Sequence, residues 1–336
     1  MPFHLDLPTI WAFILAFAIF AYVVMDGFDL GIGILFPSFQ VGEERDQAMN
    51  SIAHVWDGNE TWLVLGGGGL MAAFPLAYAV ILPATYPLVI AMLLGLLFRG
   101  VAFEFRWRHA AHRPAWDLAF CIGSIVATLA QGMLLGALLQ GIEIKADNYA
   151  GGRFDWLSPF SLLTGLSLLA GYALLGATWL IGKAQGSGQA HARRLAGWLA
   201  PATLLGMAAV SAATPFLSID YWRRWFAFPG VIFTAQVPLA TALCAALLFC
   251  CLRQQRERLP FLLALTLFAL GFVGLGISMF PFIVPEAITI WDAAAPPSSQ
   301  GFMLVGTIFI LPLILSYTAW SYWVFRGKTS TDGYHA

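Results

Sequence analysis

Nine apolar segments, each long enough to cross a lipid bilayer, follow one another along this chain with little sequence between them. The hydrocarbon core of a bilayer is about 30 Å thick, and a helix needs about 20 apolar residues to cross it. The predicted spans are residues 8–36, 50–74, 79–107, 115–142, 158–182, 195–217, 230–252, 259–283 and 302–326. Because only short loops remain, the sequence predicts an all-α integral membrane protein without a soluble domain.

Composition supports this class and excludes others. Hydrophobic residues make up 60% of the 336 positions and charged residues 10%, whereas about a quarter of the residues of a soluble domain are charged. The formal net charge is -1 and no Lys/Arg-rich run is present, which excludes nucleic-acid binding. Cys121, Cys244, Cys250 and Cys251 form no CxxC or Cys/His pattern, so neither a disulfide framework nor a zinc site is predicted.

The basic residues predict the orientation in the membrane. With nine spans, most of the Lys and Arg residues fall on one face: Arg45, Arg106, Arg108, Arg113, Lys183, Arg193, Arg194, Arg253, Arg256, Arg258, Arg326 and Lys328. The other face has only Lys145, Arg153, Arg223 and Arg224. Because cytoplasmic loops carry the excess of positive charge, the N-terminus is predicted outside and the C-terminus in the cytoplasm.

Polar and charged side chains inside the spans gather in the first four, and spans five to nine carry no comparable set. They are Asp26 and Asp29, then His54, Asp57 and Glu60, then Arg99 and Glu104, and finally Asp117. Residues three apart share one face of a helix. All of these positions fall in the predicted cytoplasmic half of the membrane. We therefore expect four consecutive helices to form one acidic cluster that opens toward the cytoplasm.

The cost of intramembrane charge indicates what such a cluster could do. An ionised acid at the bilayer centre costs about 2.5 to 3.5 kcal/mol, so these groups must face the bundle interior or water. One arginine cannot neutralise the acids around it, so some carboxyls must keep or share protons. Arg99 is predicted as the structural charge partner. The candidates for a proton pathway are Asp26, Asp29, His54, Asp57, Glu60, Glu104 and Asp117.

Simpler interpretations of these residues stay open. Arg99 could be a static clamp between helices, and Glu104 and Asp117 could be interfacial residues that reach the headgroups. His54 could be a hydrogen-bonded structural residue. The cluster by itself also fits a proton-coupled transporter or channel without redox chemistry.

The histidines argue against a redox cofactor held by this chain alone. A haem in a helical bundle needs axial ligands at matched depth, and only His54 lies well inside a span. The others are terminal or in loops: His4, His109, His112, His191 and His335. A His54/Met pair would need Met25 or Met92 opposite the imidazole. No dinucleotide, P-loop or iron–sulphur motif is present, so no catalytic or metal residue is predicted.

Several motifs carry a resemblance to a known family. They are DGFDLGIG (26–33), NSIAHVWDGNETWL (50–63), FRGVAFEFR (98–106), LLQG (138–141), MFPFIVP (279–285), ITIWDA (288–293), SSQ (298–300) and LSYTAWSYWVFRGK (315–328). In these motifs and their order the chain resembles subunit II of the cytochrome bd quinol oxidases, including the cyanide-insensitive branch. The resemblance covers essentially the whole chain.

The resemblance implies a fold and a set of partners. The fold would be two four-helix bundles, 8–142 with the acidic cluster and 158–283, plus a peripheral helix at 302–326. The partner would be subunit I, which in that family holds haem b, haem d and the quinol site, and some complexes carry a further small subunit. The present chain would then be haem-free. Whether it binds a quinone or specific membrane lipids stays open.

The resemblance also implies an activity and a location. The complex would lie in the bacterial cytoplasmic (inner) membrane, oxidise quinol and reduce oxygen to water with protons from the cytoplasm. Asp26, Asp29 and Asp57 match the family motifs and are carried over as candidates for proton uptake. The loop at 218–229 is short compared with the corresponding loop of some family members. A role assigned to the longer loop is therefore not expected in this chain. Besides the proton-supplying subunit and the transporter or channel, a third interpretation is a purely structural subunit that binds lipid or quinone.

Overall fold

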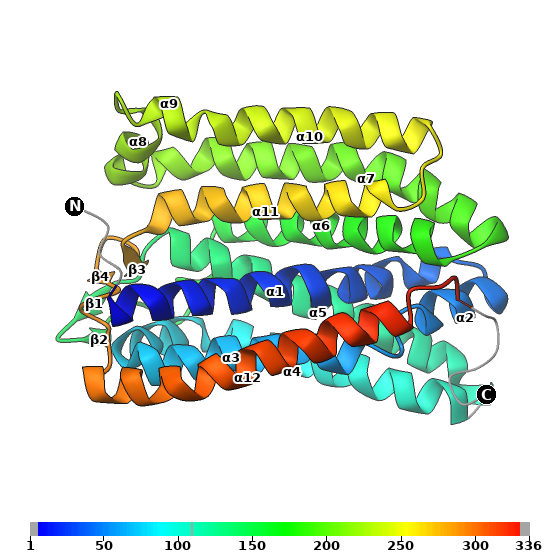
Figure 1. Ribbon diagram of the computed structural model, residues 1–336, viewed down its shortest axis with the longest axis horizontal. Coiled ribbons are helices and arrows are strands. Elements are labelled where there is room, and N and C mark those ends of the chain that lie inside the picture. Colours follow the sequence, from blue (N-terminus) through cyan, green and yellow to red (C-terminus); the bar gives the residue numbers. More distant parts are fainter. Residues whose placement is uncertain (1–5, 109, 330–336) are drawn as a thin grey trace.

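The computed structural model describes residues 6–108 and 110–329 as a bundle of long helices that lie side by side (Figure 1). The helices are α1 (Leu7–Leu35), α2 (Glu43–Asn50), α3 (Trp56–Ala73), α4 (Pro75–Arg108), α5 (Arg113–Leu139), α6 (Pro159–Lys183), α7 (Gly186–Ala213), α8 (Ile219–Phe226), α9 (Val231–Thr234), α10 (Gln236–Arg253), α11 (Leu259–Met279) and α12 (Pro297–Val324). Short 3₁₀ helices are η1 (Phe36–Ser38), η2 (Ala110–His112) and η3 (Thr214–Phe216).

Two small hairpins and the short helix α8 lie at the end of the bundle where α1 begins (Figure 1). The antiparallel strand pairs are β1 (Ile144–Lys145) with β2 (Asn148–Tyr149), and β3 (Phe282–Val284) with β4 (Ile288–Thr289). At the opposite end, basic residues terminate or begin helices, as with Arg108, Arg113, Lys183 and Arg253. We call this second end, which carries the longer list of basic residues given above, the basic end.

Local capping chemistry explains where two of the long helices begin. The Asp6 carboxylate accepts a hydrogen bond from the backbone N–H of Thr9 at 3.0 Å, and a proline follows in the first turn of α1. Ser158 and Ser161 exchange side-chain and backbone hydrogen bonds at the start of α6. Both arrangements satisfy N–H groups that a helix leaves unpaired at its N-terminus.

The all-α membrane class is confirmed, but the count of nine spans is not. In the described residues, eight helical segments are long and apolar enough to cross a membrane. The predicted span 50–74 is not among them. Its first residues end α2 and form a turn, and the 18-residue helix α3 begins only at Trp56. Asp57, Asn59 and Glu60 lie in its first two turns, and these polar residues lower its mean hydropathy.

The helix α3 nevertheless connects the two ends of the bundle. It follows α2 at the basic end and ends at the opposite end of the bundle (Figure 1). There the Ala73 carbonyl accepts hydrogen bonds from Ala295 N at 2.9 Å and Gln300 Nε2 at 3.1 Å. Other helix boundaries also differ from the predicted spans. For example, α7 begins at Gly186, whereas the predicted span begins at residue 195.

Glycines let two pairs of helices approach closely. A Cβ added at Gly31 in α1 would collide with the Tyr172 carbonyl of α6, and one at Gly176 would collide with the Gly31 backbone. In the pair α4 and α5, a Cβ at Gly95 would lie 2.6 Å from the Gly123 carbonyl oxygen. Small residues at such crossings are the main route to close helix packing in membranes. Both crossings lie near the charged residues of α1 and α4.

The last helix, α12, lies along α1 and α3 and is weakly packed (Figure 1). Its most apolar window has no buried residue. Hydrogen bonds fix it near both ends instead. Trp11 Nε1 donates to the Gln300 carbonyl at 3.1 Å, and the Tyr322 hydroxyl donates to Asn59 Oδ1 at 2.9 Å.

A buried charge cluster as the candidate functional site

Arg99 lies at the centre of a buried cluster formed by three helices. Its Nη1 is 2.5 Å from Asp26 Oδ1 and 3.4 Å from Glu60 Oε1, and its Nη2 is 3.9 Å from Asp29 Oδ2. The side chains of Arg99, Asp26 and Asp29 are fully buried. The structure thus brings residues of α1, α3 and α4 together around one guanidinium. We call Arg99, Asp26, Asp29 and Glu60 the Arg99 cluster.

Asn59 links this cluster to the peripheral helix. Its Nδ2 donates to Asp29 Oδ2 at 2.7 Å and to the Met25 carbonyl at 3.3 Å, while its Oδ1 accepts from the Tyr322 hydroxyl. Both sides of the buried amide are therefore occupied, which fixes its orientation. Sequence reasoning missed Asn59 and Tyr322 because neither carries a charge. Their place in the motifs at 50–63 and 315–328 was the available signal.

Replacing Tyr322 with Phe should loosen α12. The change removes the hydrogen bond to Asn59, which contributes about 1 kcal/mol to stability. We expect a lower thermal unfolding midpoint for the purified complex. The matched control is Tyr317→Phe on the same helix, whose side chain is 69% exposed. Equal unfolding midpoints for the two variants would contradict the proposed link.

The charges of the Arg99 cluster do not balance if every carboxyl is ionised. One guanidinium faces three carboxyls, so full ionisation would leave two uncompensated negative charges in a largely dry site. Leaving a buried charge unpaired costs several kcal/mol. In the described chain, Asp26 Oδ2, Asp29 Oδ1 and Arg99 Nε also have no hydrogen-bond partner. Full ionisation of all three carboxyls would therefore be costly in this site.

A second branch of buried polar groups extends from Asp26 into the bundle. The Tyr22 hydroxyl interacts with Asp26 and accepts a hydrogen bond from Gln131 Nε2 at 2.7 Å. The Tyr172 hydroxyl donates to Gln131 Oε1 at 2.9 Å. Because an amide cannot pass a proton without changing its tautomer, Gln131 interrupts this branch as a proton route. Sequence reasoning missed these three uncharged residues.

The cluster reaches the protein surface along α3. The Glu60 side chain is 27% exposed, whereas the other three members are fully buried. One turn earlier on α3, Asp57 is exposed and close enough to Glu60 to interact electrostatically with it. A row of acids therefore leads from the outer face of α3 to Arg99.

Three predicted members lie elsewhere, and two of them are His54 and Glu104. His54 lies in the turn before α3, and its ring stacks on Phe325 with centroids 4.1 Å apart. Glu104 pairs with Arg108 at 3.6 Å, with both side chains about half exposed. Glu104 is five residues after Arg99, which places it about 140° around the helix. The prediction that all these residues join one cluster is therefore wrong for His54 and Glu104.

Asp117 belongs to a separate cluster at the basic end. Its carboxylate contacts Arg106 Nε at 2.6 Å and Arg45 Nη1 at 2.8 Å, and Arg106 Nη1 contacts Asp46 at 2.7 Å. Two acids and two bases balance here, as in a structural clamp between helices. Arg106 follows Arg99 by seven residues, about two turns, so the two guanidiniums lie on one face of α4. That spacing was the signal that sequence reasoning overlooked.

Metal-binding side chains do not gather in the part of the chain that the structure describes. Among these residues no group of three or more His, Cys, Asp or Glu side chains could hold a metal ion. His4, His109 and His335 lie outside the described residues.

Comparison with known proteins decides the family. Residues 7–325 match the family described as cytochrome bd terminal oxidase subunit II. The chain belongs to this family. It is 30% identical to the cytochrome bd-I ubiquinol oxidase subunit 2 of Escherichia coli (strain K12), over 96% of this chain and 95% of that protein. It is 28% identical to the cytochrome bd ubiquinol oxidase subunit 2 of Bacillus subtilis (strain 168), over 97% of each.

A solved structure supports the same fold for this subunit II. The bd oxidase of Geobacillus thermodenitrificans matches with a TM-score of 0.77 over 95% of this chain and 98% of that chain, at 20% identity. The resemblance predicted from the motifs is therefore confirmed. The chain is a multi-pass inner-membrane subunit of a quinol oxidase complex, which is an oxidoreductase, and the family implies a subunit I as its partner.

Proposed function

We propose that this chain is the haem-free subunit II of a complex that oxidises quinol and reduces oxygen to water. In this proposal it stabilises a haem-bearing subunit I, which holds haem b and haem d, and it passes protons from the cytoplasm toward that subunit. The observation that carries the proton role is the Arg99 cluster, in which three carboxyls surround one buried guanidinium. The basic end would face the cytoplasm, as the excess of Lys and Arg indicates.

The proton path would begin at Asp57 and continue through Glu60. Asp57 lies in the first turn of α3, near the basic end, and is exposed. From Glu60 a proton would reach Asp26 or Asp29. These two carboxyls share one guanidinium, that of Arg99, which can neutralise only one of them. Arg99 stays charged and positions the carboxyls, while Asn59 and Tyr22 orient Asp29 and Asp26.

The same face of α3 supports the proposed contact with subunit I. Asp57 and Thr61 share this face with apolar side chains such as Val64, which is 73% exposed. A carboxylate on a helix at membrane depth is costly against lipid and is found against protein or water. We infer that subunit I covers this face.

Two predictions from the resemblance remain part of the proposal. The first is the division into a four-helix bundle at 8–142, a second at 158–283 and a peripheral helix at 302–326. The second is a further small subunit and a bound quinone. The family assignment favours the oxidase over a transporter or channel, because the relatives are subunits of ubiquinol oxidases.

Replacing Asp57 with Asn should slow proton delivery while leaving the complex assembled. The exposed side chain has little packing to lose, so we expect quinol-dependent oxygen uptake to fall at least tenfold, in line with the about 10²–10⁴-fold that a positioned proton-transfer group contributes. Glu60→Gln should have a similar effect. The haem bands of the purified complex measure assembly.

The matched control is Thr61→Val, one turn after Asp57 on the same exposed face. It should leave oxygen uptake unchanged. Normal turnover of an assembled Asp57→Asn complex would reject the proton path through this residue. A colourless wild-type protein that purifies without a second subunit would reject the oxidase assignment itself.

A further inference from the structure

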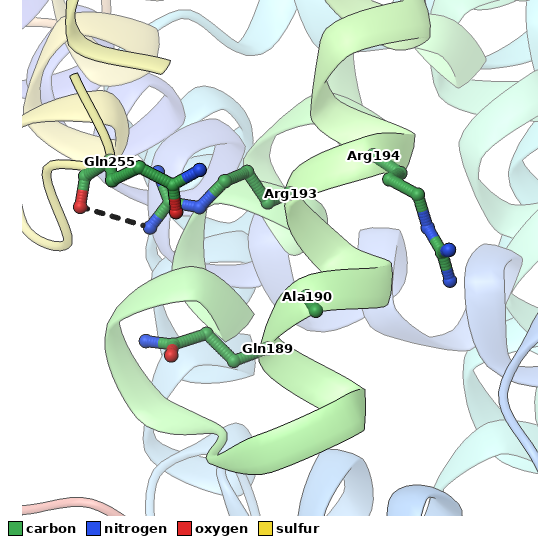
Figure 2. Close-up of a pocket in the computed structure, with 5 residues that line it drawn as sticks. All are labelled: Gln189, Ala190, Arg193, Arg194 and Gln255. Atoms are coloured by element: carbon green, nitrogen blue, oxygen red, sulfur yellow. Dashed lines mark hydrogen bonds between the residues drawn. The ribbon is translucent and has the colours of Figure 1, made fainter. Parts of the chain in front are cut away.

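A cavity at the basic end lies far along the chain from the Arg99 cluster. It is lined by Gln189, Ala190, Arg193 and Arg194 from the first turns of α7 and by Gln255 from the loop between α10 and α11, and its volume is about 330 Å³ (Figure 2). The Arg193 and Arg194 side chains extend to opposite sides of Ala190 (Figure 2). The guanidinium groups of Arg193 and Arg194 therefore lie on either side of the small residue Ala190.

Arg193 is held in place by the neighbouring loop. Its Nη1 donates to the Arg256 carbonyl at 3.1 Å and its Nη2 to the Gln255 carbonyl at 3.2 Å, the second bond being drawn in Figure 2. These partners are neutral. Arg194 is exposed, and its Nη2 is 3.5 Å from His191 Nδ1. Within residues 6–108 and 110–329, no carboxylate lies within 4.0 Å of either guanidinium.

The charge around the cavity is positive on balance, although Glu44 interacts electrostatically with Arg194 and His191. Arg253, Arg256 and Arg258 are exposed in and beside the adjoining loop. The acid of that loop, Glu257, is already engaged by Lys328 Nζ at 3.0 Å and by Gln189 Nε2 at 3.0 Å. The hydrogen bond from Gln189 and the Lys328 ammonium hold the pKa of Glu257 below its usual range. Glu257 thus stays ionised and neutralises only one of the surrounding bases.

The cavity also lies where lipid headgroups are expected. It is at the basic end, where α7 begins and continues as an apolar membrane-spanning helix. Trp198, one turn beyond Arg194 on the same face, is 80% exposed. Exposed tryptophans mark the boundary between headgroups and acyl chains. Basic pockets between membrane helices on the cytoplasmic side suit anionic lipid headgroups.

We propose that this cavity binds the phosphate of an anionic phospholipid headgroup. Arg193 and Arg194 would contact the phosphodiester oxygens, and the Gln255 side-chain amide would donate to a headgroup oxygen. The acyl chains would descend past Trp198 along α7. Guanidinium groups suit this ligand because they donate several hydrogen bonds to phosphate oxygens in a fixed geometry.

Native mass spectrometry of the intact, delipidated complex tests the site. Phosphatidylglycerol is titrated in a detergent that contains excess phosphatidylcholine, and the retained phosphatidylglycerol is counted. The variant Arg193→Gln/Arg194→Gln should weaken retention roughly thirtyfold, since each basic residue near the surface contributes about 1 kcal/mol. The matched control, Arg153→Gln/Arg223→Gln, removes the same charge at the opposite end and should retain the lipid as the wild type does.

Three outcomes would overturn the proposal. Equal retention by the wild type and the Arg193/Arg194 variant would remove the site. An equal loss in the Arg153/Arg223 control would show that only net charge matters. Displacement of phosphatidylglycerol by millimolar inorganic phosphate would identify a site for the free anion. If the double variant fails to assemble, Arg194→Gln alone keeps the test, because Arg194 holds no loop carbonyl, and a loss of roughly fivefold is expected.

Discussion

Replacing Arg99 with Met should destabilise the assembled complex by about 3–5 kcal/mol, the usual effect of removing one partner from a buried ion pair. The change leaves Asp26 and Asp29 fully buried without their positive partner. We expect little assembled complex in the membrane and a sharply lower unfolding midpoint for what remains. Both can be measured from the haem absorbance of purified membranes during heating.

Two further variants separate charge from shape at this site. Arg108→Met removes a guanidinium from the same helix, but its partner Glu104 and Arg108 itself are about half exposed, so the effect should stay below about 1 kcal/mol. Combining Arg99→Met with Asp26→Asn and Asp29→Asn should recover part of the loss because the uncompensated charges are removed. If the combined variant is no more stable than Arg99→Met, charge is not the reason for the destabilisation.

Replacing Gly31 with Ala should be nearly as damaging, although it adds one methyl group. The new Cβ would collide with the Tyr172 carbonyl oxygen, and a backbone atom cannot rotate away as a side chain can. Overpacking a core costs about 1–3 kcal/mol and occasionally more, and we expect the upper end of this range or beyond. Because α1 and α6 would have to separate, Asp29 would also shift away from Arg99.

The yield of assembled complex and its unfolding midpoint measure this effect. Gly197→Ala is the matched control, since an added Cβ there meets nothing within 4 Å. It should be neutral or stabilise α7 by up to about 1 kcal/mol, because alanine favours helix more than glycine does. Stability of Gly31→Ala equal to that of Gly197→Ala would mean that α1 and α6 are not in close contact.

Parts of the Arg99 cluster could be predicted, because helical spacing puts Asp26 and Asp29 on one face and the cost of burial requires a partner such as Arg99. Other parts could not. Glu104 is close to Arg99 in sequence, yet it points outward because five residues rotate the helix by about 140°. His54 was placed inside a span, but the chain turns at 51–55 and starts α3 afterwards. Local polarity does not tell where a helix begins when the first turn itself is polar.

The membrane class, most of the spans, the motifs of the family and the surplus of acids over bases were determined by the sequence alone, because each depends on the residues of one segment. In lipid every backbone group must be satisfied within its own helix, so apolar length is enough to predict a span. Which groups meet was decided only by the tertiary structure. The contacts of Asp29 with Asn59 and of Gly31 with α6 depend on how each helix is rotated and shifted against its neighbours, and side-chain packing across the whole bundle sets that rotation.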